Sequence, residues 1–74
     1  MILCRFTNCS NDEMIHHINQ VGKLNILGID RSAMFVPNND LHHVMVTSYV
    51  KSIVESGKTI VVKTENSTYI FEKL

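Results

Sequence analysis

The sequence is poor in the residues that mark a metal site, a phosphate-binding loop or a disulfide framework. Its 74 residues include two cysteines, three glycines, one proline and no tryptophan. Neither C-x₂-C nor H-x₃₋₅-H spacing occurs, so nothing in the spacing supports a structural zinc site. The three glycines form no phosphate-binding loop. The sequence therefore contains no short motif that would indicate a zinc site or a phosphate-binding loop.

Long apolar runs and an excess of one charge are absent too. Seven basic residues balance seven acidic residues, without a block of either sign. Proteins that bind nucleic acid regardless of its sequence usually carry a basic excess, because neutralised phosphates supply most of the affinity. The first residues lack the apolar stretch of a signal peptide, and no run approaches membrane-spanning length. We therefore expect a cytoplasmic protein that does not enter a membrane, with Cys4 and Cys9 as reduced thiols.

The composition indicates one small globular domain that covers residues 1–74. Apolar residues make up 45% of the chain and charged residues 19%, which is typical of a folded domain. A core of this size stabilises weakly. Because self-association would bury further apolar surface, we expect a homo-oligomer.

The C-terminal part of the chain, from Val44 onward, consists of β-branched runs separated by short turn signals. This pattern predicts a three-stranded antiparallel meander. Glu55-Ser56-Gly57 fits a three-residue hairpin loop, with Gly57 at the position of positive φ, and Glu65-Asn66 fits the second turn. The apolar side chains that would then share one face are Val46, Val50, Val54, Ile60, Val62, Tyr69 and Phe71.

The predicted turns also set the strand register. In the first hairpin Val50 lies opposite Val62, and in the second hairpin Val62 lies opposite Tyr69 and Ile60 opposite Phe71. The alternative is an amphipathic helix from Asp40 to Ser56, because several of its valines also fit helical spacing. The many β-branched residues favour the strand, since they lose side-chain freedom in a helix.

The N-terminal half predicts one helix and several short strands. Ser10 and Glu13 form a capping box, an apolar stripe follows, and Gly22 stands where a C-terminal cap belongs, which predicts a helix over residues 11–21. Strands are expected at 2–6, 24–29 and 33–36, and Pro37 ends the last of them because it has no amide to donate.

No group of residues indicates catalysis or a cofactor. The adjacent pairs His16-His17 and His42-His43 point apart on any helix, so neither pair readily supplies two ligands to one metal ion. Cys9 near the histidines could approach a nucleophile–base arrangement, but so short a chain leaves little room for a shielded pocket. We therefore expect no enzyme, no metal and no cofactor.

Binding is the remaining class, and two small groups of residues are candidates. Tyr49, Lys51 and Lys63 cluster on the second face of the predicted meander, with Tyr49 opposite Lys63. An aromatic ring between cations suits a partner protein or an exposed nucleic-acid base, although it also suits a cross-strand pair that covers the sheet. Arg31 and Phe35 offer a second candidate patch near the turn at residues 30–32.

The run Thr47-Ser48-Tyr49-Val50, followed by Val62-Lys63-Thr64-Glu65-Asn66-Ser67-Thr68-Tyr69, resembles the C-terminal halves of short, uncharacterised phage and prophage proteins. The shared features are a T-S-x-V strand and a T-x-N-S-x-Y hairpin, within residues 47–69. The resemblance implies a small accessory protein of a mobile element that binds a host protein or itself. It implies no catalytic residue.

Together these observations predict an α+β domain. One N-terminal helix packs on a curved antiparallel β-sheet that can close toward a small, partly open barrel. The predicted function is that of a non-enzymatic regulator or inhibitor that acts by protein–protein interaction and self-association. The alternative is a small β-barrel that binds single-stranded nucleic acid through Tyr49, Lys51 and Lys63.

Overall fold

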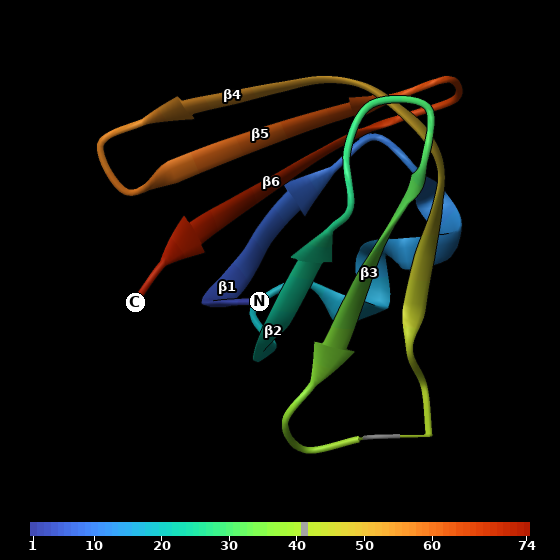
Figure 1. The fold of residues 1–74 in the computed structure, drawn as a ribbon. Coiled ribbons are helices and arrows are strands. Elements are labelled where there is room, and N and C mark those ends of the chain that lie inside the picture. Colours follow the sequence, from blue (N-terminus) through green and yellow to red (C-terminus); the bar gives the residue numbers. More distant parts are fainter. Residues whose placement is uncertain (41) are drawn as a thin grey trace.

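The computed structural model describes residues 1–40 and 42–74, and these form an antiparallel β-barrel (Figure 1). Each strand pairs with its neighbours in sequence, and the first and last strands pair with each other, which closes the barrel. The strands are β1 (Ile2–Cys9), β2 (Val21–Ile26), β3 (Ser32–Pro37), β4 (Met45–Ser56), β5 (Thr59–Thr64) and β6 (Thr68–Lys73). Within the described residues the one helical segment is a 3₁₀ helix, η1 (Asp12–His17), between β1 and β2.

The predicted helix over residues 11–21 does not form, so the α+β prediction is wrong and the fold is nearly all β. Helical geometry ends at Ile18, whose ψ is 137°, and Asn19 follows with a φ of 77°. Phe6 of β1 supplies the reason. Its N–H donates to the carbonyl of Gln20, and its carbonyl accepts from the N–H of Asn19. Pairing with β1 thus replaces the last turn of the predicted helix, because tertiary hydrogen bonds outweigh a weak local preference.

The capping signal lies one residue further along than predicted. The Asn11 side chain accepts from the Glu13 N–H at 3.0 Å and begins η1. The Ser10 hydroxyl, the predicted cap, instead accepts from the Thr68 N–H at 2.9 Å and ties the end of β1 to β6. Met14 and Ile18 pack against the core from η1 and its C-terminal end, so the connection still contributes apolar side chains to the core.

Aromatic rings fill the barrel. Phe6 lies 5.2 Å from Phe71 and 6.0 Å from Phe35, measured between ring centroids, and all three are essentially inaccessible to solvent. Edge-to-face and tilted ring contacts of this kind add to the free energy gained by burial alone. The full set of buried apolar residues is Cys4, Phe6, Leu24, Ala33, Phe35, Met45, Val50, Ile60, Val62, Tyr69 and Phe71.

The C-terminal meander forms, and the second of its predicted hairpins has the predicted register. Val62 lies opposite Tyr69, and Ile60 lies opposite Phe71. The region from Met45 is a strand rather than the alternative helix; Leu41, near the start of that alternative, lies outside the described residues.

The first predicted hairpin is wrong by three residues in its register. The turn is Gly57-Lys58, and it is flanked by Ser56 opposite Thr59. Gly57 has a φ of +59°, which suits the first central position of a type II′ turn. Ile53 therefore lies opposite Val62; beyond the register shift between Val50 and Ser52, Val50 lies opposite Thr64 rather than Val62.

Two irregularities in β4 decide which of its side chains face inward. The register shifts between Val46 and Tyr49 in the pairing with β3, and again between Val50 and Ser52 in the pairing with β5. Each such bulge adds a residue to one strand and so reverses the alternation beyond it. Met45 and Val50 are buried, whereas Val46 and Val54, which we predicted to face inward, are 50% and 56% exposed.

Candidate functional site

The predicted cluster of Tyr49, Lys51 and Lys63 is not assembled as expected. Tyr49 is 55% exposed on the outer face of β4, opposite Ser32 of β3. Lys63 lies opposite Ser52, because the true turn moves β5 by three residues along β4. The carbonyl of Tyr49 accepts from the N–H of Glu65, so its neighbour on the β5 side is an acidic residue.

Lys51 is already paired with a carboxylate. Its Nζ donates to Oδ1 of Asp30 at 2.8 Å. This hydrogen bond, together with the charge of Asp30 and a smaller contribution from Glu65, raises the pKa of Lys51 above its usual value. Both side chains are exposed, and the adjacent carboxylate of Asp30 reduces the net positive charge that a phosphate would meet there.

Arg31 and Phe35 do not share a surface. Arg31 is exposed between β2 and β3, and its carbonyl accepts from the Val50 N–H at 2.9 Å. Phe35 has no exposed area and lies in the aromatic core. It cannot contact a partner of the folded protein, and its proposed role in binding is wrong for that reason.

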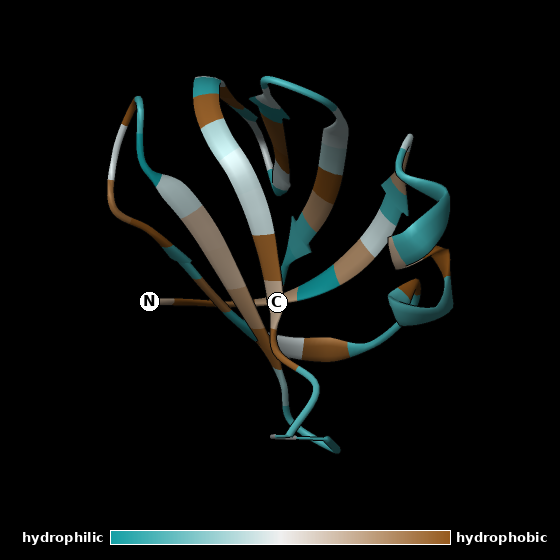
Figure 2. Cartoon of the chain, turned by 90° about the vertical axis from the view of Figure 1, so that its right-hand side faces the viewer, coloured by the Kyte–Doolittle hydropathy of each residue, from teal (hydrophilic) through white to brown (hydrophobic). Residues whose placement is uncertain are grey.

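The outer face of β3 and the first half of β4 carries an apolar surface that the sequence interpretation did not identify. We call it the β3–β4 patch. Met34 lies directly opposite Val46 across the two strands. In Figure 2 both strands rise from the hydrophilic loop at the bottom; apolar colours run along β3, whereas β4 is apolar near its start and close to neutral over its middle. The patch comprises Met34 (41% exposed), Val44 (38%), Val46 (50%) and Tyr49 (55%), with Val36 half-buried among them.

Charge distinguishes this patch from the other outer faces. By the strand registers, each of the remaining strands presents a charged residue outward: Arg5 on β1, Lys23 on β2, Lys63 on β5 and Glu72 on β6. The outward positions of β3 are Ser32, Met34 and Val36, without a charge. A sequence signal existed, since Ala33-Met34-Phe35-Val36 is a continuous apolar run, and such runs indicate a strand that is covered on both faces.

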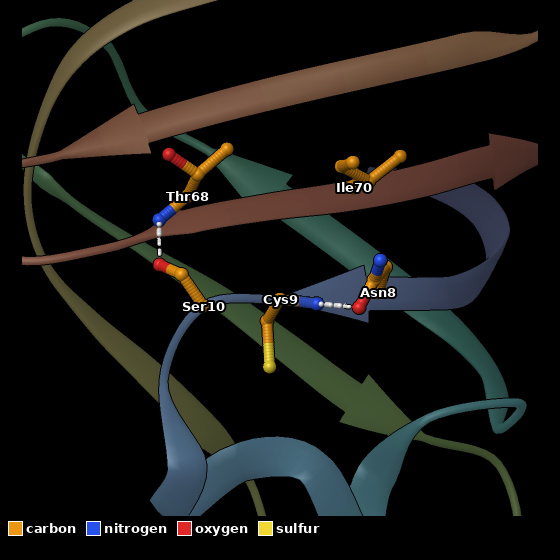
Figure 3. A pocket seen from close by; sticks show the side chains of 5 residues that line it. All are labelled: Asn8, Cys9, Ser10, Thr68 and Ile70. Carbon is orange, nitrogen blue, oxygen red and sulfur yellow. Dashed lines mark hydrogen bonds between the residues drawn. The ribbon is translucent and has the colours of Figure 1, made fainter.

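A shallow pocket of about 200 Å³ lies between β1 and β6 (Figure 3). The Sγ of Cys9 points away from the other side chains there and donates to the carbonyl of Asn11 at 3.3 Å. None of the lining residues is a histidine, a carboxylate or a lysine that could act as a base. They are Asn8, Cys9, Ser10, Thr68 and Ile70. The pocket therefore holds no arrangement for nucleophilic catalysis.

The histidines do not gather into a metal site. His17 is buried, and its Nδ1 lies 2.7 Å from Oε1 of Gln20. Over residues 1–40 and 42–74, no three histidine, cysteine, aspartate or glutamate side chains lie close enough together to hold a metal ion. In the same part of the chain, no helix has the length and hydropathy required to cross a membrane.

Comparisons of the chain with protein-family models, with curated proteins and with solved structures find no match.

Proposed function

We propose that the chain is a small non-enzymatic regulatory or inhibitory protein, and that it acts by docking the β3–β4 patch against an apolar surface of another protein. The observation that carries this proposal is the exposure of Met34 directly opposite Val46, with the exposed Tyr49 further along β4, where β3 presents no charged residue outward. Monomeric proteins seldom leave contiguous apolar side chains in water unless the surface has a role in binding. Methionine and tyrosine are also enriched at the centres of protein interfaces.

The neighbouring residues indicate what kind of partner fits. Lys23 lies opposite Val36, and Asn25 lies opposite Met34, so β2 forms a polar rim along one side of the patch. An apolar centre with a polar rim is the usual arrangement of a protein interface. The partner would present uncharged apolar side chains to the patch and an acidic group near Lys23.

Single-stranded nucleic acid is less well supported as a ligand. Stacking of bases on an aromatic ring needs nearby cations that are free to contact phosphates. Lys51 is paired with Asp30, and Tyr49 has Glu65 as its neighbour. An origin in a phage or prophage, a cytoplasmic location and self-association all stay predictions.

The test is affinity capture with three versions of the protein. Val46→Lys places a charge at the centre of the patch without touching the core, because Val46 faces outward. Thr59→Lys is the matched control, since Thr59 is an exposed β-branched residue on β5, beside Glu72. We expect the wild type and Thr59→Lys to retain the same partner protein and Val46→Lys to lose it.

Thermal unfolding of the three proteins accompanies the capture, and equal midpoints exclude loss of fold as the cause. A partner that Val46→Lys retains at wild-type level would contradict the use of this patch. Capture that disappears after nuclease treatment would support the nucleic-acid alternative instead.

A further inference from the structure

We propose that two copies of this chain associate face to face through the outer side of the ribbon that β5 and β6 form with the C-terminal half of β4. Figure 1 shows these three strands side by side. The contact is centred on an apolar row that consists of Val54, Val61 and Ile70, and we call this surface the ribbon face. It is separate from the β3–β4 patch, so the dimer contact is additional to the docking proposed above.

The strand registers place the three residues of the row on one side of the sheet. Val54 lies opposite Val61, and Val61 lies opposite Ile70. Paired residues share a face, and successive residues along a strand alternate between the faces. Val61 stands between Ile60 and Val62, which are both buried, so the whole row points outward. The register shift in β4 lies N-terminal to these pairs, and the alternation here is unbroken.

The residues around the row are mostly small. Val54 is 56% exposed, and Val61 and Ile70 are partly exposed. Figure 3 shows Ile70 and Thr68 on the same side of β6. Short and β-branched side chains let two sheets stack about 10 Å apart. The outward positions beside the row are Ser52 and Ser56 on β4, Thr59 and Lys63 on β5, and Thr68 and Glu72 on β6.

The two charged residues of the ribbon face lie on opposite sides of the row. Lys63 is on one side, opposite Thr68, and Glu72 is on the other side, opposite Thr59. Both are exposed, and neither takes part in an ion pair with any residue that the structure describes. Arg5 of β1 lies opposite Glu72 but forms no ion pair with it. The single chain therefore presents one cation and one anion here that a second molecule can pair.

This arrangement of charges fits a second copy of the chain. A twofold axis along the row stacks each apolar residue on its counterpart and exchanges the two sides of the row. Lys63 of one copy then lies over Thr59 of the other, one strand spacing of about 4.8 Å from Glu72 of that copy. The contact occurs twice, and the two lysines stay about 13 Å apart along the strands.

A twofold axis along the strands gives the opposite result. It would bring Lys63 of one copy close to Lys63 of the other, and Glu72 close to Glu72. Like charges that face each other across an interface suppress that arrangement. The charges therefore select the axis along the row.

Three short strands from each copy make a small contact, which belongs to the weak and reversible class. The first test is sedimentation velocity from about 10 μM to about 1 mM protein, where such contacts dissociate. We expect the wild type to change from monomer to dimer over this range. Val54→Lys should stay monomeric, because it sets two like charges face to face on the row. Val46→Lys makes the same change on the β3–β4 patch and should dimerise as the wild type does.

Exchange of the two charges tests the symmetry. Lys63→Glu alone and Glu72→Lys alone should each dimerise at least about tenfold more weakly, because each replaces two attractive contacts with two repulsive ones. In an equimolar mixture of these variants, the new glutamate of one faces the new lysine of the other, while the native Lys63 faces the native Glu72. Dimerisation of the mixture should therefore return to the wild-type level.

Four results would overturn the ribbon-face dimer. They are a wild type that stays monomeric, single charge variants that dimerise as the wild type does, a mixture of the folded variants that stays monomeric, and loss of the dimer in Val46→Lys. The last result would assign the contact to the β3–β4 patch. Thermal unfolding of each variant shows that it is folded.

Methyl resonances of the wild type give a residue-level test that needs no variant. The methyl groups of Val54, Val61 and Ile70 should shift with protein concentration, whereas those of Met34 and Val46 should not. Shifts confined to Met34 and Val46, or no shift at all, would contradict the ribbon-face contact. Affinity capture uses dilute protein, in which so weak a dimer is dissociated, and its result with the patch variants is therefore independent of this contact.

Discussion

Gly22 of β2 occupies a position where a side chain would not fit, and Gly22→Ala is the sharpest test of the barrel. Gly22 is buried and lies opposite Cys4 on one side and Pro37 on the other. A Cβ added there would lie 2.3 Å from the carbonyl oxygen of Val36 and 2.9 Å from Cζ of Phe35. The first contact is with backbone, so the β2–β3 ladder itself must move.

The expected cost follows from this overlap. Overpacking in a well-packed core typically destabilises by 1–3 kcal/mol, and a clash with backbone lies at or above the upper end, so we expect about 3 kcal/mol or more. A domain of this length has a free energy of unfolding of about 4–11 kcal/mol in total. A loss of about 3 kcal/mol lowers the unfolding midpoint of such a domain by roughly 12–24 °C.

The assay is thermal unfolding followed by circular dichroism, with Gly57→Ala as the control. Gly57 has no heavy atom within 4 Å of an added Cβ, so its substitution costs only the strain of a positive φ. That strain is about 1–2 kcal/mol. If Gly22→Ala lowers the midpoint by no more than Gly57→Ala does, then Gly22 is not in the close approach between β2 and β3 that we describe.

The remaining predictions concern the core. Val62→Asp places a charge without a partner between Ile53 and Tyr69, at a position with no exposed area. It should lower the free energy of unfolding by about 4 kcal/mol or more and so abolish the cooperative urea transition. A retained transition would contradict the assignment of Val62 to the core. Burial raises the pKa of the Cys4 thiol from 9.0 to about 11. Between those pH values the unfolded chain loses this proton while the folded chain keeps it, so the free energy of unfolding should fall by up to about 3 kcal/mol as the pH rises. Urea midpoints of the wild type should therefore decline more steeply above pH 9 than those of Cys4→Ala, and parallel curves would exclude Cys4 as the cause.

The candidate site was predicted less well than the strands. The choice of Tyr49 as an exposed aromatic agrees with its position, but its assumed neighbour Lys63 depended on a hairpin register that is wrong. Phe35 was assigned to a surface because the sequence indicated a turn nearby, but the sequence did not indicate which face of the strand its side chain occupies. The β3–β4 patch went unrecognised because Val46 was assigned to the inner face.

The sequence by itself determined the features that depend on near neighbours. β-branched runs and turn residues located the strands of the C-terminal meander, and the turn after Thr64 set the correct pairing of β5 with β6. Only the tertiary structure decided the rest. The bulges in β4, the pairing of Asn19 and Gln20 with Phe6, and the close approach at Gly22 all depend on residues far apart in the chain. Closing a sheet into a barrel constrains every strand at once, and those constraints outweigh the small local preferences that a sequence pattern reports.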